Sequence, residues 1–98
     1  MTYVLLTTKP GRFRTEPGDG MRPVETWHYH HAGRLRASYV IAELAGEGRI
    51  TIVDEEPPQA VNRLPSKFLP RYKTLQAARD ELAQLARGPG ARLERVEA

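Results

Sequence analysis

Two histidines stand two residues apart in the segment Trp27-His28-Tyr29-His30-His31. In a β-strand, His28 and His30 would point to the same face, and two imidazoles on one face can bind a metal ion. A third ligand is needed, and none of the acidic residues considered has a diagnostic spacing to the pair: Glu25, Glu43 and Asp54. The segment also lacks the glutamate that follows the His-x-His of the cupin motif. We therefore expect no metal and no cofactor, and keep His28 and His30 as weak candidate ligands.

Residues 9–23 form a second candidate, because they combine glycine, proline and arginine in one stretch. Glycines expose backbone N–H groups, and the cations Lys9, Arg12, Arg14 and Arg22 would attract an anion. The stretch has no Gly-Lys-Ser/Thr and does not match the dinucleotide-binding fingerprint. The alternative is a solvated loop whose acidic residues partly cancel its charge.

Aromatic residues alternate with cations at three places: Arg12-Phe13-Arg14, Lys67-Phe68 and Arg71-Tyr72-Lys73. Bases stack on aromatic rings flanked by cations, which is typical of nucleic-acid binding. The competing interpretation is that Phe68 and Tyr72 anchor their segment to the core. The candidates for nucleic-acid or anion binding are Lys9, Arg12, Phe13, Arg14, Arg22, Arg34, Arg36, Lys67 and Arg71.

Catalytic chemistry has little support in the sequence. The run Asp54-Glu55-Glu56 contains adjacent carboxylates, but consecutive strand-end residues point in different directions. No Ser-His-Asp spacing or nucleophile elbow is present, and the absence of cysteine excludes a thiol nucleophile. We expect no catalytic residues and no enzymatic activity.

Four segments carry the alternation and composition of β-strands: residues 3–8, 24–31, 35–44 and 49–54. Residues 35–44 are apolar on both faces toward their far end, which indicates a central strand. Short glycine turns join the last three segments, so these strands must be antiparallel. Prolines and glycines predict a loop without a regular element over residues 9–23.

A proline-rich connector over residues 55–73 is expected to be irregular, with one helical turn near 65–69. Thr74 then begins a helix, in which leucine and alanine recur at helical spacing until Gly88-Pro89. The predicted fold class is α+β: an antiparallel meander of about four strands with one C-terminal helix packed on one sheet face. Residues 1–87 would form a single domain and residues 88–98 a flexible tail.

The layout of residues 24–87 resembles that of AP2-type and integrase-arm DNA-binding domains. The likeness is a three-strand meander followed by a helix that opens Thr74-Leu-x-Ala-Ala78. In those domains arginines and a tryptophan on the sheet read the DNA groove. The resemblance concerns layout alone and implies a DNA-binding sheet only by analogy.

Composition and charge leave two functional classes. The net charge of +3 is uneven: residues 1–36 and 58–98 are basic, and residues 37–57 are acidic. The favoured hypothesis is a small non-catalytic accessory module that binds an unknown protein, through the connector or through the edge of the first strand. Its candidate contacts are Pro57, Pro58, Leu64, Pro65 and Phe68. The alternative is a nucleic-acid-binding module with a basic, aromatic-interleaved surface.

The environment of the protein is predicted from the same composition. The first residues are too short an apolar run for a signal peptide or a membrane span, so we expect a cytoplasmic protein with no membrane partner. The uncharged first strand, if it lies at a sheet edge, can pair with another copy. The expected state is a monomer or a strand-paired homodimer.

Overall fold

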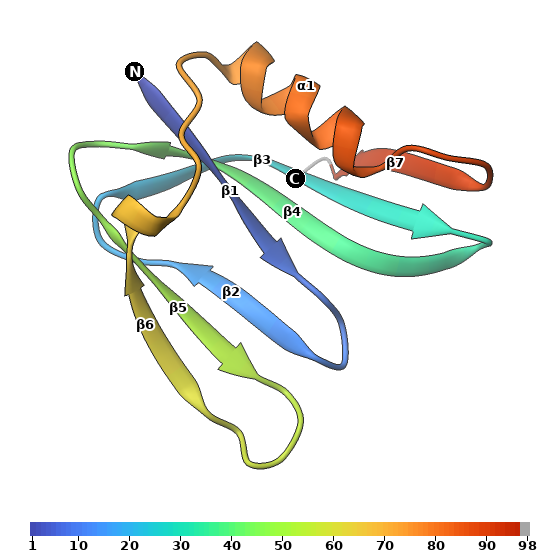
Figure 1. The fold of residues 1–98 in the computed structure, drawn as a ribbon, viewed down its shortest axis with the longest axis horizontal. Helices are drawn as coiled ribbons and strands as arrows, with labels where there is room; N and C mark the ends of the chain where they lie inside the picture. Colours follow the sequence, from blue (N-terminus) through green and yellow to red (C-terminus); the bar gives the residue numbers. More distant parts are fainter. Residues whose placement is uncertain (97–98) are drawn as a thin grey trace.

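The computed structural model describes residues 1–96 as an α+β fold of two antiparallel sheets and one α-helix (Figure 1). The predicted class is confirmed, although there are seven strands rather than about four. The elements are β1 Thr2–Thr8, β2 Phe13–Pro17, β3 Met21–His31, β4 Arg34–Leu44, β5 Arg49–Asp54, β6 Val61–Pro65, the short 3₁₀ helix Ser66–Phe68, α1 Leu75–Leu85 and β7 Ala91–Val96. Within the described residues, no helix has the length and apolar character needed to cross a membrane.

The larger sheet has the strand order β1-β4-β3-β7. The predicted central position of β4 is confirmed, because it pairs with β1 on one side and with β3 on the other. Its residues Ile41 and Ala42 are both fully buried although they point to opposite faces. Other parts of the chain therefore cover both faces of this sheet, which explains why β4 is apolar on both sides.

The smaller sheet has the order β2-β5-β6, and two of its strands correct the sequence interpretation. Residues 9–23 are not a loop without regular structure: they contain β2 and the start of β3. The connector 55–73 contains β6 as well as the expected helical turn. Neither strand has an apolar alternation of its own, and both are formed by pairing with β5. The predicted meander is therefore divided, with β5 in the second sheet.

The tight turn between β1 and β2 is one of the connections between the two sheets. Lys9 accepts a backbone hydrogen bond from Arg12, and Pro10-Gly11 occupy the centre of this turn, with Gly11 at φ 80°. Proline followed by a residue with positive φ is the pattern of a type II turn. The Lys9 N–H donates to the Phe13 carbonyl, so β2 begins directly beside the end of β1.

The apolar core consists of two clusters on opposite faces of the larger sheet. Between the sheets, Val4, Leu6, Ala42 and Leu44 pack against Ile50 of β5. On the other face, the second cluster joins the strands to α1: Ala37, Tyr39 and Leu82, with Trp27, Tyr29 and Leu93 partly buried around them. The larger sheet is therefore the middle layer of the molecule (Figure 1).

The helix α1 follows the sequence prediction closely. Thr74 caps it, and its side-chain oxygen accepts a hydrogen bond from the Ala77 N–H at 3.0 Å. Ala78 and Leu82, four residues apart, are its buried residues and face the sheet. Leu85, which continues the same helical spacing, is 52% exposed, so the predicted apolar face of the helix is only partly buried.

Residues 91–96 form β7 rather than the expected flexible tail. The strand pairs antiparallel with β3, from Thr26 opposite Val96 to His31 opposite Ala91. Leu93 packs on the cluster beneath α1, and this contact attaches a mostly polar segment to the sheet. Residues 97 and 98 of the predicted tail lie outside the described residues.

Candidate functional site

The structure brings three predicted cations around one hollow of about 390 Å³. Lys9 and Arg12 come from the β1–β2 turn, and Arg36 comes from β4. The remaining wall includes Leu35 and the two tyrosines Tyr29 and Tyr39. We call this the basic pocket. Its lining residues belong to the β1–β2 turn and to the β3–β4 hairpin.

A β-bulge places Arg36 at the basic pocket. The register of β3 and β4 shifts between Tyr29 and His30: Tyr29 stands opposite Ala37, and His30 opposite Leu35. Arg36 is the extra residue between these two pairs. Bulges redirect side chains, and here Leu35, Arg36 and Ala37 all line the same hollow although a regular strand would alternate them.

Two tyrosines, Tyr29 and Tyr39, line the basic pocket. Tyr39 is only 8% exposed, and Tyr29 is half-buried beside it. Burial, together with the proximity of Tyr29, raises the pKa of Tyr39 above its ordinary value. The Tyr39 hydroxyl is thus a neutral hydrogen-bond donor at physiological pH.

The other predicted cations lie apart from the basic pocket. Arg14 pairs with Glu16 at 3.2 Å on the smaller sheet, and Arg22 pairs with Glu43 at 2.8 Å across β3 and β4. Lys67 lies 5.5 Å from the ring centre of exposed Phe68. Arg14 and Arg22 are therefore each paired with a carboxylate, and Lys67 lies beside an aromatic ring.

Within residues 1–96, no further metal-ligating side chain lies with His28 and His30 in an arrangement that could hold a metal ion. The ring centres of His28 and His30 are 6.1 Å apart, on the sheet face that Trp27 and Tyr29 do not share. No group of three or more His, Cys, Asp or Glu residues in this range is arranged to hold a metal ion.

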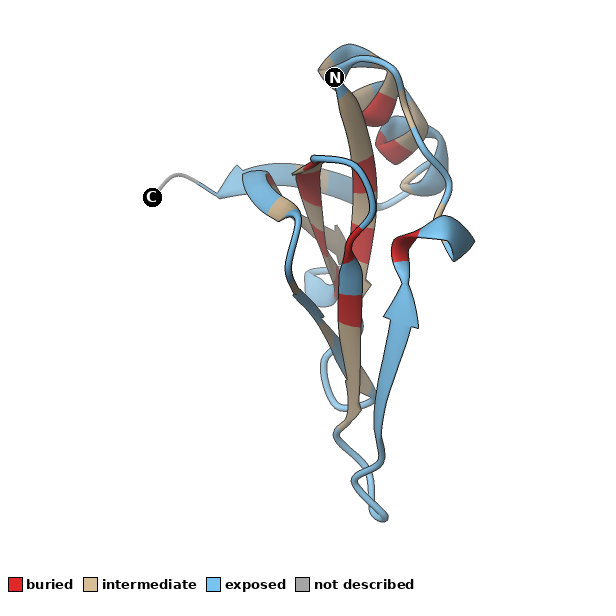
Figure 2. Cartoon of the chain, turned by 90° about the vertical axis from the view of Figure 1, so that its left-hand side faces the viewer, coloured by how far each residue is buried: buried red, intermediate tan, exposed pale blue. Residues whose placement is uncertain are grey.

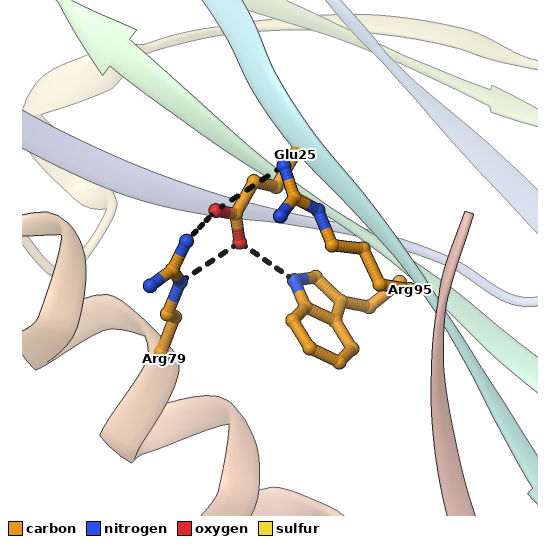
Figure 3. Close-up of polar contacts among 4 residues, drawn as sticks. Glu25, Arg79 and Arg95 are labelled. Carbon is orange, nitrogen blue, oxygen red and sulfur yellow. Dashed lines mark hydrogen bonds and ion pairs between the residues drawn. The ribbon is translucent and has the colours of Figure 1, made fainter. Parts of the chain in front are cut away.

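A buried charge network that the sequence analysis missed surrounds Glu25 (Figure 3). Its side chain is 1% exposed. One carboxylate oxygen accepts hydrogen bonds from the Trp27 indole at 2.9 Å and from Arg79 Nε at 3.0 Å, and the other accepts from the second guanidinium nitrogen of Arg79. Arg95 lies 3.7 Å away. The network joins β3, α1 and β7, which are distant in sequence.

The hydrogen bonds and charges around Glu25 keep its carboxylate ionised. The hydrogen bond from Arg79 lowers the pKa of Glu25, and this outweighs the effect of burial; Trp27 and the charges of Arg79 and Arg95 lower it further. A carboxylate held ionised, with both oxygens bonded, is poorly suited to accept a proton from a substrate. We interpret the network as a structural connection between helix and sheet.

The predicted protein-interaction residues lie on the smaller sheet and its loops. Leu64 and Pro65 belong to β6, whose five residues are all exposed (Figure 2). Phe68 follows on the 3₁₀ helix and is 67% exposed, so the interpretation as a core anchor is wrong for this ring. Pro57 and Pro58 line a hollow of about 420 Å³ that shares Lys9 and Arg12 with the basic pocket.

Comparison of the chain with protein-family models, with curated proteins and with solved structures finds no match.

Proposed function

We propose that this protein is a non-catalytic accessory module that binds an extended segment of a partner protein along the open edge of β6. The observation that carries the proposal is this edge. β6 pairs with β5 on one side, and every one of its residues is exposed (Figure 2). An unpaired strand edge is a template for an added strand.

The alternation of backbone hydrogen bonds along β6 identifies the N–H and C=O groups that can bind a partner strand. The Ser66 N–H donates to the Gly48 carbonyl, and the Ala60 carbonyl accepts from the Asp54 N–H. The backbone N–H and C=O groups of the even-numbered residues between 60 and 66 therefore point toward β5. The backbone groups of Val61 and Arg63 therefore point outward, and Pro65 ends the edge because it has no N–H. Val61, which is 58% exposed, adds apolar surface at the same place.

The edge of β1, which the sequence suggested as an alternative, is largely occupied. Tyr3 exchanges two backbone hydrogen bonds with Tyr72. Further along β1, the Thr7 carbonyl accepts from the Thr15 hydroxyl, and Lys9 bonds to Phe13. A second copy pairing here would have to displace these contacts, so the edge of β6 is favoured for strand addition.

Charge around β6 favours an acidic partner segment. Arg63 lies within the strand, Arg49 stands opposite Pro65, and Lys67 follows at its end. Arg49 and Arg63 also line one hollow on the outer face of the smaller sheet. Carboxylates on an added strand would pair with these cations, while the backbone ladder supplies affinity that depends little on sequence.

The proposal is tested with peptides selected from a random display library against the whole chain. We expect acidic peptides that protect the Val61 and Arg63 amides from hydrogen exchange. The variant Val61→Pro removes an outward N–H and leaves the β5 ladder intact. It should weaken binding at least about tenfold, which is about 1.4 kcal/mol.

The matched control is Val61→Ala, which keeps the outward N–H and removes most of the side chain. Binding to Val61→Ala should remain closer to that of the unaltered chain. If the selected peptides bind both variants equally, or shift amides away from β6, strand addition at this edge is rejected.

The nucleic-acid alternative remains a prediction. It would be supported by oligonucleotide affinity that falls steeply with salt, because phosphate contacts release counterions. The pairing of Arg14 and Arg22 with carboxylates does not favour it. A cytoplasmic location is kept as part of the proposal, since a chain without cysteine suits a reducing compartment.

A further inference from the structure

We propose that the basic pocket binds the phosphate group of a small organic phosphate monoester, with Lys9, Arg12 and Arg36 around the phosphate and the tyrosines beside the organic part. This site is separate from the edge of β6 and does not depend on strand addition. Its residues come from the β1–β2 turn, β3 and β4.

Charge points to a phosphate monoester rather than a carboxylate. Within residues 1–96, Lys9, Arg12 and Arg36 make no ion pair with another side chain. Asp54 and Glu56 line the neighbouring hollow of about 420 Å³. A carboxylate would supply one negative charge, whereas a phosphate monoester carries about −1.5 to −2 at neutral pH and three acceptor oxygens. Guanidinium groups bind two such oxygens at once, and two arginines are present.

The frame of the basic pocket is held in place without a ligand. The β1–β2 turn is closed by hydrogen bonds from Arg12 and Phe13 to the Lys9 carbonyl, and the Arg12 carbonyl accepts from Glu55. The bulge fixes the backbone position of Arg36. A preformed frame reduces the entropy lost when a small ligand is ordered.

The tyrosines give the basic pocket a way to distinguish an organic phosphate from the free ion. Tyr39 is buried in the core cluster, and Tyr29 packs against that cluster. Tyrosine hydroxyls can donate hydrogen bonds to phosphate oxygens, and the aromatic rings and Leu35 offer apolar contact. The volume of about 390 Å³ lies within the range of small-molecule sites.

The test is an NMR titration of the whole chain with phenyl phosphate, inorganic phosphate and phenol as probes. We expect phenyl phosphate to shift amides of residues 9–12 and 35–39 and the ring signals of Tyr29 and Tyr39. Its dissociation constant should be on the order of 1 mM or lower, a range suited to a small fragment. Inorganic phosphate should bind less tightly, and phenol should cause no comparable shifts.

Two arginine variants separate the basic pocket from general attraction of anions. Arg36→Gln should weaken phenyl phosphate binding about tenfold, as expected for loss of a charge-assisted hydrogen bond. Arg34→Gln is the matched control: it removes the same charge from the same strand, at a residue that does not line the basic pocket. Its effect should be less than about twofold, because exposed charges are screened by salt.

Three results would overturn the proposal. Equal losses in Arg36→Gln and Arg34→Gln would show attraction of anions without a site. Inorganic phosphate that binds as tightly as phenyl phosphate would exclude recognition of the ester. A single-stranded oligonucleotide that binds through the same residues more tightly than phenyl phosphate, with a steep salt dependence, would assign the surface to nucleic acid instead.

Discussion

Glu25 brings a negative charge into the interior between β3 and α1. A buried carboxylate without partners would lose several kcal/mol of hydration, and the hydrogen bonds from Trp27 and Arg79 offset this cost. Arg79 remains 36% exposed, so the removal of Glu25 would leave a cation that still reaches water. This limits the expected effect of a substitution.

We predict that Glu25→Gln lowers the free energy of unfolding at pH 7 by about 2 kcal/mol, because charge-assisted hydrogen bonds become neutral ones. The folded state holds the pKa of Glu25 below its ordinary value of 4.5, so the unfolded chain takes up this proton first. The stability due to Glu25 is therefore present above about pH 4.5 and is lost as the pH falls through the lowered pKa. Urea unfolding followed by circular dichroism at several pH values measures the difference between the two proteins.

The control for this prediction is Glu43→Gln, which breaks the surface pair with Arg22. It should change stability by less than about 1 kcal/mol, as is usual for exposed ion pairs. If Glu25→Gln is as stable as the unaltered chain at both pH 7 and pH 3, the network does not hold the helix to the sheet.

At the scale of elements, β7 shows how a polar segment becomes a strand. Its pairing with β3 satisfies the backbone, and Leu93 packs on the cluster of Ala37, Tyr39 and Leu82. Arg95 also approaches Glu25 from this strand. The docking of β7 therefore depends on a few contacts that are visible only in the folded chain.

We predict that Leu93→Ala destabilises the protein by about 1–2 kcal/mol, less than a fully buried leucine because Leu93 is only half-buried. Glu94→Ala, on the opposite and exposed face, should change stability by less than about 0.5 kcal/mol. Thermal unfolding of both variants compares the two effects. Equal stability of the two variants would mean that β7 is not held against the sheet in solution.

For the whole molecule, the relation between the two sheets depends on close backbone packing at one corner. A Cβ atom on Gly48 would lie 2.5 Å from the Asp19 carbonyl oxygen and 3.1 Å from Leu44. Gly48 also donates its N–H to the hydroxyl of buried Ser66 at 2.9 Å, and accepts from the Ser66 N–H at 2.8 Å. The turns before β3 and β5 thus meet the end of β6 at this glycine.

We predict that Gly48→Ala costs about 2 kcal/mol or more of stability, because the added methyl group pushes the two turns apart. Gly46→Asn is the matched control. It lies in the same turn at φ 72° with open space around it, and asparagine tolerates this conformation. Chemical denaturation measures the free energy of unfolding of both variants. If Gly48→Ala is as stable as Gly46→Asn, the backbone at Gly48 is not closely packed.

The α+β class, the strands β1, β3, β4 and β5, and the helix α1 with its cap at Thr74 can be predicted from the sequence. These elements have their own periodicity of two or of about 3.6, and each has a local signal at its ends. The anion-binding prediction for Lys9, Arg12 and Arg36 came from composition, and the grouping of these residues was not visible in it.

The tertiary fold establishes where β2, β6 and β7 form, because these strands are stabilised by pairing with a neighbour rather than by their own apolar pattern. It also decided the bulge that turns Arg36 toward Tyr29 and Tyr39, and the network that joins Glu25 to Arg79, 54 positions further along the chain. Long-range pairing and packing are not encoded in any short stretch of residues, so spacing along the chain cannot predict them.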